Sequence, residues 1–445
     1  MRFIPVTCED QAHMLARVGV GSVDDLFADV PEDARLARPL ALPEPMGEVE
    51  LSAHLMSLAK ANTDASDVVS FLGGGCYDHY VPAVVDAVIS KPAFFTAYTP
   101  YQPEVSQGTL QAIYEYQSMI CQLTGMEVAN ASMYDGATAF AEAALMACRV
   151  TKRQRVLVSQ SVHPEWRQTL ATYVEAGTVT VTEVAGADGL ADVEALAAEL
   201  ADDVAAIMVA SPTFYGTLDD LGALGELAHE AGALLVVGTN PILLGVMEPP
   251  ATYGADIVVA EGQPLGSPMS YGGPGLGVFT CRQAHLRQMP GRVAGRTTDV
   301  DGKTGFVLTF STREQHIRRE KATSNICSNH ALNALAAGVY LSAVGREGLR
   351  GIAEACVAKA HYLEAALVST GRFERAFAAP FGYEFALQYR GDVAEMQRTL
   401  VARGFFAGLD LAAFSPDDAG LVLFAVTEKR TRAELDRFVG EVSAL

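Results

Sequence analysis

The sequence predicts an α/β fold in which a mostly parallel, doubly wound sheet is followed by a smaller C-terminal α/β domain. Strand-like and helix-like segments alternate between residues 109 and 280, and strand-like segments such as Ala-Ile-Met-Val-Ala at 206–210 are apolar throughout. Both patterns are typical of parallel strands buried on two faces. The length of 445 residues allows two or three domains of about 150 residues each.

Residues 1–62 are predicted to form an N-terminal helical arm. Its expected helices are Glu9–Val18, Ser22–Ala28 and Ser52–Asn62, and the proline-bearing segment Arg38–Pro45 is expected to be a linker. The run Phe71-Leu72-Gly73-Gly74-Gly75 marks a loop, because glycine permits close backbone approach.

A large α/β domain is predicted over residues 63–325. It begins with a helix at Thr109–Thr124, whose apolar residues recur at helical spacing and which Gly125 ends. Further helices are expected at Gly136–Cys148, Pro164–Glu175, Val193–Leu200 and Asp219–Ala231. Strands are expected at Arg155–Ser159, Thr178–Val184, Val204–Ala210, Ala233–Val237, Asp256–Ala260 and Gly277–Thr280.

The small C-terminal domain is predicted over residues 326–445, after a long loop at Gly291–Gly305 that is rich in Gly, Arg and Asp. Its expected helices are Asn329–Val344, Glu347–Ser369, Val393–Arg403 and a last one from Thr431, with strands at Gly382–Gln388 and Leu421–Val426.

The composition excludes several classes of protein. A formal net charge of −21 gives no sign of the basic patch that nucleic-acid binding needs. The first residues contain no apolar run typical of a secretion signal, and no run approaches the roughly 18 residues of a membrane helix. The seven cysteines are scattered without a Cys-x-x-Cys pair, so we expect buried thiols in a soluble cytoplasmic protein, with no metal site and no disulfide frame.

Residues 98–139 are the most informative stretch of the chain. They hold five of the fifteen tyrosines and many hydroxyl and amide side chains, but no Lys or Arg. Buried polar groups need hydrogen-bond partners. The partners expected here are one another, an adjoining subunit or a polar ligand.

Three motifs admit both a functional and an ordinary structural interpretation. Asp135-Gly136-Ala137-Thr138 opens a helix and suits either a phosphate site or a simple N-cap. His163 follows a strand and suits either stacking on an aromatic cofactor or a capped loop. The aromatic loop Tyr98–Pro103 suits either a ligand or interface role or a packed loop. Gly272–Gly277 resembles no dinucleotide fingerprint, because it precedes a strand.

Five stretches of the sequence resemble the alpha-subunit branch of the glycine cleavage system P-protein family. They are YTPYQPEVSQGTLQAIYEYQSMICQLTGMEVANASMYDGATA (98–139), FLGGGCYDHYVPAVV (71–85), VHPEWRQTL (162–170), YGADIVVAEGQPLGSPMSYGGPGLG (253–277) and REKATSNICSN (319–329). The resemblance implies the fold of fold type I pyridoxal-phosphate enzymes, which are similar to aspartate aminotransferase. It also implies an alpha2-beta2 heterotetramer that decarboxylates glycine on pyridoxal phosphate and passes the aminomethyl group to the lipoyl arm of H-protein.

The resemblance also implies that this chain lacks two groups of the cofactor site. The position of the Schiff-base lysine falls on Pro264, and the position of the aspartate that pairs with the cofactor ring falls on Val237. Of the seven lysines, only Lys321 has a distinctive context, and an ion pair is its ordinary interpretation. A vestigial cofactor pocket is expected at Asp135, Gly136, Thr138 and His163.

The resulting hypothesis is that pyridoxal phosphate is held by the beta subunit, and that this chain, inactive alone, completes the beta subunit's active site. The residues expected to line that shared site are Tyr98, Tyr101, Gln102, Glu104, Ser106, Thr323 and Ser324. Two alternatives remain open: a self-sufficient pyridoxal-phosphate lyase that uses an unexpected lysine, and a purely structural or regulatory partner.

Overall fold

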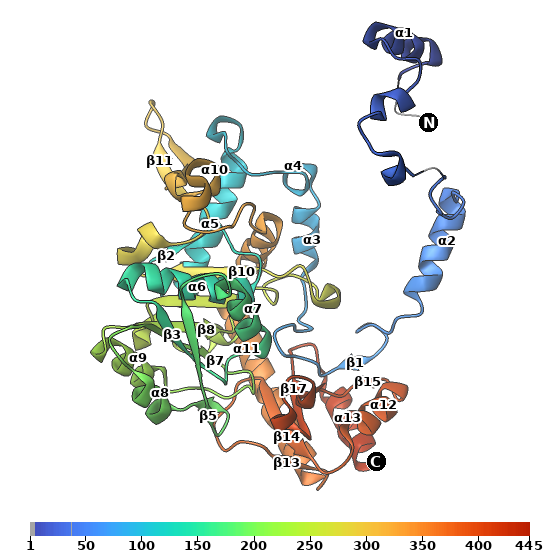
Figure 1. Cartoon of the computed structure of the whole chain (residues 1–445). Coiled ribbons are helices and arrows are strands. Elements are labelled where there is room, and N and C mark those ends of the chain that lie inside the picture. Colours follow the sequence, from blue (N-terminus) through green and yellow to red (C-terminus); the bar gives the residue numbers. More distant parts are fainter. Residues whose placement is uncertain (1–4, 37) are drawn as a thin grey trace. The chain divides into compact units, whose positions relative to one another are not determined.

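The computed structural model describes residues 5–36 and 38–445, which form two compact units divided between Thr63 and Asp64 (Figure 1). Met1–Ile4 and Ala37 lie outside the described residues. All of them belong to the predicted N-terminal arm, and Met1–Ile4 also belong to the first residues, where no secretion signal is predicted.

The first unit is a string of short helices. Helix α1 (Cys8–Val18) starts at a capping box in which Thr7 and Asp10 bind each other's backbone N–H groups, and α2 spans Glu48–Ala59. The helix predicted at Ser22–Ala28 is only a 3-10 turn, η1 (Asp24–Phe27), because the Asp25 carboxylate accepts the N–H groups of Gly21 and Ser22 and holds a tight turn. No described residue of this unit is buried, so it has no core of its own.

The second unit is built on a seven-stranded sheet of order β2-β10-β9-β8-β7-β3-β4. The strands are β2 (Val128–Ala129), β3 (Arg155–Ser159), β4 (Thr180–Val184), β7 (Val204–Ser211), β8 (Leu234–Thr239), β9 (Ile257–Glu261) and β10 (Gly277–Cys281). The five neighbouring strands β9, β8, β7, β3 and β4 are parallel, and β10 pairs antiparallel with both β9 and β2. The predicted mostly parallel sheet is therefore confirmed.

Helices cover both faces of this sheet (Figure 1). Helices α6 (Gly136–Thr151) and α7 (Pro164–Val174) pack on the face that presents Val158, Met208 and Val236. Helices α8 (Val193–Glu199) and α9 (Leu221–Glu230) pack on the opposite face. In each strand, the residues on this face alternate with those on the first face. A sheet buried on two faces explains why its strands read as continuous apolar runs.

The C-terminal part of the unit contains a four-stranded antiparallel sheet of order β13-β14-β17-β16. Its strands are β13 (Phe373–Arg375), β14 (Glu384–Tyr389), β16 (Leu409–Asp410) and β17 (Leu421–Ala425), and its helices are α12 (Val393–Ala402) and α13 (Arg432–Ser443). Strand β1 (Val69–Ser70) pairs with β15 (Phe405–Phe406), which ties the start of this unit to its C-terminal part.

Helix α11 (Ala331–Ser369) connects the two sheets. It is interrupted at Gly345, whose φ of 60° and ψ of −174° are not helical. This break lies between the two helices predicted at Asn329–Val344 and Glu347–Ser369. The remaining helices are α3 (Ala83–Ile89), α4 (Pro92–Phe95), α5 (Gln107–Thr124) and α10 (Gln315–Arg318).

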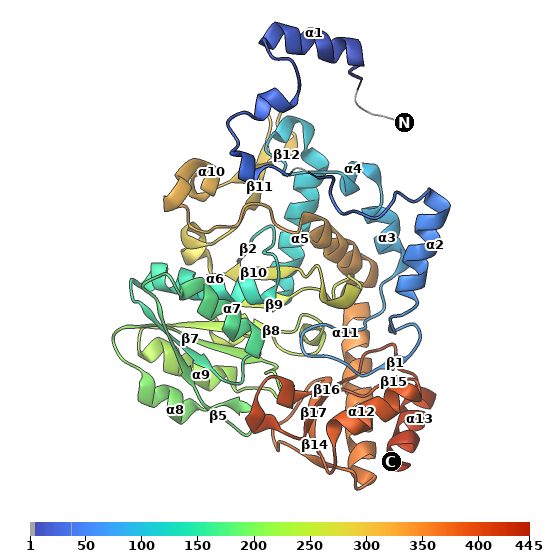
Figure 2. The ribbon, with the colours of Figure 1, turned by 45° about the vertical axis from the view of Figure 1, so that its right-hand side comes forward.

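The prediction of a long loop at Gly291–Gly305 is wrong. The segment forms most of a β-hairpin of β11 (Val293–Thr298) and β12 (Thr304–Thr309), which lies against α5 (Figure 2). Two side chains of α5 hold it: Gln117 exchanges hydrogen bonds with the backbone of Ala294, and Gln107 with that of Phe306, at 2.8–3.0 Å. Tertiary contacts with a distant helix thus overrode a glycine-rich local sequence.

Two minor hairpin strands, β5 (Gly186–Ala187) and β6 (Leu190–Ala191), connect β4 to α8. Across residues 5–36 and 38–445, none of the helices combines the length and apolarity that crossing a bilayer requires.

Candidate functional site

The candidate site lies at the carboxyl edge of the seven-stranded sheet. The chain leaves β3 for β4 on one side and returns through β7 on the other, so the strand order reverses between β3 and β7. Ligands of open α/β sheets bind at such a switch point. His163, Phe214, Asn240 and Glu261 follow or end successive strands there and line one small cavity of about 60 Å³.

Asp135 and Thr138 cap helix α6. The Asp135 carboxylate accepts the Thr138 N–H at 2.7 Å, and the Thr138 hydroxyl oxygen accepts the Asp135 N–H at 3.2 Å. The two side chains therefore satisfy each other's backbone groups, which is the geometry of a capping box. Their arrangement matches the simple N-cap, while the Gly136 N–H still points away from the helix.

The Glu261 side chain occupies the space in front of the α6 N-terminus. Its carboxyl group accepts three backbone N–H groups, from Gly136 at 2.9 Å, Gln263 at 2.8 Å and Leu276 at 2.8 Å. This is the position at which a helix N-terminus would hold the phosphate of a ligand. Burial raises the pKa of Glu261 from 4.5 to about 7, against the lowering effect of the three N–H groups.

Trp166, on the first turn of α7, fills the space beside Glu261. A Cβ atom added at Gly136 would lie 2.5 Å from Cζ2 of the indole, and one added at Gly238 would lie 2.9 Å from Cζ3. The indole therefore fits against two glycines that leave room for it.

His163 uses both ring nitrogens within the chain. Nδ1 accepts the Glu165 N–H at 3.1 Å, so Nε2 carries the proton and donates to the Gly74 carbonyl at 2.8 Å. The Phe214 ring packs edge-on against it, with 4.7 Å between the ring centroids. Burial lowers the pKa of His163, which keeps the imidazole neutral.

The structure places Pro264 and Val237 in the protein interior. Val237 packs with Val209 and Leu235 on the face of the sheet that α8 and α9 cover. Its neighbours Gly238 and Thr239 line the cavity, and neither carries a carboxylate. Lys321 lies on an exposed turn, and no lysine of the described chain lines the cavity.

Glu384, on β14, closes the cavity from the C-terminal part of the unit. Its carboxyl group accepts the Gly74 N–H at 2.6 Å and the Tyr77 hydroxyl at 2.7 Å. Burial raises the pKa of Glu384 to about 7. Two carboxyl groups, the half-buried Glu261 and the buried Glu384, therefore line the same small cavity.

The raised pKa values of these two carboxyl groups predict that the free energy of unfolding depends on pH. Because their pKa values are raised on folding, from 4.5 to about 7, the folded state binds protons more tightly than the unfolded state between these values. Stability is therefore expected to fall as the pH rises from about 4.5 to about 7, on the order of 2 kcal/mol per group.

Urea unfolding at pH 5, 6 and 7 measures this slope. Glu384→Gln is expected to flatten it, and Glu230→Gln on an exposed face of α9 is the control that leaves it unchanged. An identical slope in Glu384→Gln and in the unsubstituted chain would contradict the prediction.

The residues predicted to face a partner form an exposed surface. Tyr98 is 76% exposed and Tyr101 is 50% exposed, while Gln102 and Glu104 are exposed and Ser106 is half-buried. The Tyr98 hydroxyl lies 3.4 Å from Ser328 Oγ, so the 98–106 loop lies beside the 313–328 segment.

Thr323 and Ser324 also belong to this region, but they differ in how their side chains are used. The Ser324 hydroxyl donates to the Glu142 carboxylate and accepts the Ile326 N–H. Thr323 is held by its backbone, which donates to the Arg313 carbonyl at 3.0 Å. Thr323 is therefore the better placed of the two to bind a group outside this chain.

The sequence alone did not indicate the roles of four residues. They are Glu261, Glu384 and Arg292, and Trp166 as the side chain that fills the space beside Glu261. Arg292 is buried beneath the 98–106 loop and binds Thr99 and Tyr101. No local pattern indicates the roles of these residues, because most of their partners lie far away in the chain.

His79, Cys356 and Glu428 bring three potential metal ligands within 4.8 Å of one another. They bind each other instead: His79 Nδ1 lies 2.6 Å from Glu428 Oε2, and the Cys356 thiol donates to the same oxygen at 3.5 Å. Burial raises the pKa of the Cys356 thiol, whereas metals bind the thiolate. The three side chains therefore join the 77–80 loop to the C-terminal part of the second unit.

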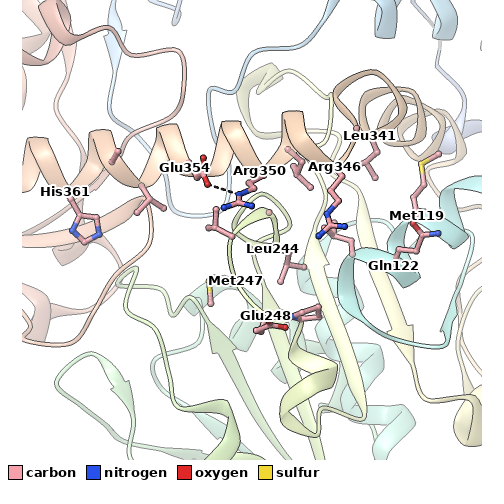
Figure 3. A pocket seen from close by; sticks show the side chains of 18 residues that line it. Met119, Gln122, Leu244, Met247, Glu248, Leu341, Arg346, Arg350, Glu354 and His361 are labelled. Atoms are coloured by element: carbon pink, nitrogen blue, oxygen red, sulfur yellow. Dashed lines mark hydrogen bonds and ion pairs between the residues drawn. The ribbon is translucent and has the colours of Figure 1, made fainter.

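A larger cavity of about 1210 Å³ lies between α5, the 244–249 loop and α11 (Figure 3). Arg346 and Arg350 reach from α11 toward this loop, and Arg350 also pairs with Glu354 at 2.8 Å. None of the predicted site residues lines it.

The model of the glycine cleavage system P-protein family matches residues 1–442. The chain belongs to this family. A relative from Geobacillus kaustophilus (strain HTA426), named probable glycine dehydrogenase (decarboxylating) subunit 1, is 50% identical over 441 residues, 99% of this chain and 98% of the relative. A relative of the same name from Prosthecochloris aestuarii (strain DSM 271 / SK 413) is 51% identical over 446 residues and the full length of both chains.

Solved structures agree with this assignment. The crystal structure of glycine decarboxylase (P-protein) of the glycine cleavage system, in inhibitor-bound form, is 45% identical, with a TM-score of 0.91 over 100% of both chains. A sphingosine-1-phosphate lyase of Burkholderia pseudomallei, 18% identical with a TM-score of 0.67 over 93% of this chain and 94% of the lyase, supports the fold alone. The resemblance and the fold type I architecture predicted from the sequence are thus confirmed.

Pyridoxal phosphate, the cofactor that this family implies, does not fit the pocket of this chain. The Glu261 carboxyl group accepts the Gly136 N–H at the α6 N-terminus, where a phosphate would bind, and the Trp166 indole fills the space beside it over Gly136 and Gly238. The cavity of about 60 Å³ leaves no room for a cofactor of that size.

Proposed function

We propose that this chain is the alpha subunit of the P-protein, and that it works in complex with a homologous beta subunit that holds pyridoxal phosphate. The observation that carries the proposal is the internally filled pocket. Glu261 accepts the Gly136 N–H at the α6 N-terminus and the N–H groups of Gln263 and Leu276, and Trp166 packs on Gly136 and Gly238. A chain closed in this way is not expected to be active alone.

The complex is proposed to be an alpha2-beta2 heterotetramer that decarboxylates glycine and transfers the aminomethyl group to the lipoyl arm of H-protein. The relatives named subunit 1 support a second subunit. We further propose a cytoplasmic location, which rests on the scattered spacing of the seven cysteines.

The contribution of this chain is proposed to be one wall of the beta subunit's active site. The wall is the exposed 98–106 loop, with Tyr98, Tyr101, Gln102, Glu104 and Ser106, together with Thr323 and Ser324. The tyrosine rings supply apolar area that excludes water when a partner covers them. Water exclusion strengthens the hydrogen bonds that orient a bound carboxylate.

Four side chains of the wall have a task in this proposal. We propose that Tyr98 and Gln102 donate hydrogen bonds to the glycine carboxylate or the lipoyl arm, and that Glu104 accepts one. Thr323 is proposed to donate a hydrogen bond to the phosphate of the partner's cofactor. These tasks need only binding and orientation from this chain.

The test is substitution of the wall in the complex reconstituted with the beta subunit. Tyr98→Ala and Glu104→Gln are expected to lower kcat/KM for glycine by about 10–100-fold, because a lost hydrogen bond to a charged group costs about 1.5–3 kcal/mol. Both side chains are exposed in the isolated chain, so its stability should not change. Tyr253→Phe and Glu230→Gln, exposed on other elements, are the matched controls.

Unchanged glycine decarboxylation in an intact Tyr98→Ala or Glu104→Gln complex would overturn the wall and favour a purely structural or regulatory subunit. Sedimentation of each variant complex checks that assembly is intact.

A further inference from the structure

We propose that Arg292 is a positioning residue for the reaction, because it fixes the 98–106 loop against the 313–324 segment and so sets the shape of the shared wall. The inference rests on the proposed function and deepens it. Arg292 touches no substrate in this account and acts through Thr99 and Tyr101.

All three nitrogen positions of the Arg292 guanidinium are used within the chain. Nη1 donates to Thr99 Oγ1 at 3.2 Å, Nη2 donates to the Tyr101 hydroxyl at 2.9 Å, and Nε donates to Glu314 Oε2 at 3.1 Å. Arg292 is only 5% exposed, so these bonds are protected from competition with water. A planar fork that binds three groups at once has a fixed direction, which lysine cannot reproduce.

Glu314 makes Arg292 a bridge between the two predicted donor segments. The Glu314 carboxylate neutralises the buried guanidinium and belongs to the segment that continues through α10 to Thr323. The His316 ring, also on that segment, packs edge-on against Tyr101, with 5.5 Å between the centroids. One buried side chain thus ties Tyr101 and the Thr323 region together.

The backbone of Arg292 is itself held firmly. Its carbonyl accepts the Ala131 N–H at 2.7 Å, and the β11–β12 hairpin that it precedes is clamped on α5 by Gln107 and Gln117. The guanidinium therefore projects from a backbone that is fixed in the domain. Its hydrogen bonds hold the 98–106 loop in place relative to that domain.

The 98–106 loop has few other attachments. Its backbone hydrogen bonds are local, such as Tyr101 N–H to the Thr99 carbonyl at 2.9 Å and Val105 N–H to the Gln102 carbonyl at 3.3 Å. Tyr98 and Val105 are 76% and 80% exposed. Loops with many exposed groups and few buried contacts open at low free energy, so the loss of Arg292 should free this one.

The experiment compares Arg292→Lys and Tyr101→Phe with Arg282→Lys. Lysine keeps the charge that Glu314 needs, and Tyr101→Phe removes a single hydroxyl, so both variants should fold. Arg282 is the matched control, because it holds the 251–255 loop through bonds to the Ala255 and Ala251 carbonyls at 3.0 and 2.7 Å. Hydrogen exchange of peptides covering 98–106 and the KM and kcat for glycine of the reconstituted complex are measured.

Both test variants are expected to raise exchange over 98–106 at least tenfold in the free chain and to raise KM at least fivefold, with kcat within twofold. Arg282→Lys should change neither. Exchange within twofold of the unsubstituted chain overturns the inference, and so does an unchanged KM when Tyr98→Ala or Glu104→Gln lowers kcat/KM. If those two wall variants are also without effect, the proposed function fails and the inference falls with it.

Discussion

Replacing Glu261 by alanine is expected to destabilise the Asp64–Leu445 unit by about 3–5 kcal/mol. The substitution leaves the N–H groups of Gly136, Gln263 and Leu276 without their shared acceptor in a largely buried site. Each hydrogen bond to a carboxyl group contributes about 1.5–3 kcal/mol when charged, and an orphaned buried donor keeps its desolvation cost. Partial relaxation and entry of water reduce the sum to the range given.

Urea unfolding followed by Trp166 fluorescence measures this loss directly, because Trp166 is the single tryptophan of the chain and lies against Gly136. Inorganic phosphate is expected to restore part of the stability of Glu261→Ala, since the vacated N–H groups suit an anion, and to leave the unsubstituted chain unchanged. Glu230→Ala on the exposed face of α9 is the control. A loss below 1 kcal/mol in Glu261→Ala would show that Glu261 does not hold the pocket closed.

Replacing Asp78 by alanine is expected to lower the free energy of unfolding by about 3–5 kcal/mol. The same urea unfolding experiment measures this loss. The Asp78 carboxylate binds Lys429 Nζ at 2.5 Å and Arg430 Nη2 at 3.1 Å, and Arg430 is only 5% exposed. Removing one partner of a buried pair leaves the other charge uncompensated. The pair joins the 77–80 loop, which borders the closed cavity, to the segment after β17.

The matched control is Glu354→Ala, which removes the partner of Arg350 from an exposed i, i+4 pair on α11. Such surface pairs contribute about 0.3–0.5 kcal/mol. Equal losses in the two variants would contradict the view that the Asp78 pair holds the two parts together.

The elements of the large sheet could be predicted because their signals are local. Strand β7 is apolar from Val204 to Ala210 and buried throughout, and α6 begins at the residue after Asp135 as its cap sequence predicts. The interruption of α11 at Gly345 was also predictable, since glycine readily adopts the positive φ found there.

The β11–β12 hairpin was not predictable from its own residues. Its glycines and charged side chains read as a loop, and what stabilises it is the pairing of Ala294 and Phe306 with glutamines about 180–200 residues earlier in the chain. Contacts of such sequence separation leave no periodic signal in the segment itself.

The candidate site was predictable in outline only. The absence of a lysine at Pro264 and of a carboxylate at Val237 could be read from the sequence through the family resemblance. That Glu261 would fill the phosphate position could not, because its three donors come from residues 136, 263 and 276 and meet only in the folded chain. The same holds for Arg292, whose partners lie at 99, 101 and 314.

A filled pocket and an exposed wall fit together in one account. The carboxyl edge of the sheet, where a fold type I enzyme would hold its cofactor, is occupied by this chain's own side chains. The polar and aromatic residues of the 98–106 loop remain outside it and are exposed. This chain is then expected to act on a cofactor that another subunit holds.

The most direct test of this account is to reduce the complex of this chain and the beta subunit with borohydride in the presence of pyridoxal phosphate, and to map the pyridoxyl group by mass spectrometry. The account predicts the group on a beta-subunit lysine and an unmodified alpha chain, with the isolated alpha chain equally unmodified. A stoichiometric pyridoxyl group on any of the seven lysines of this chain, such as Lys321, would contradict it.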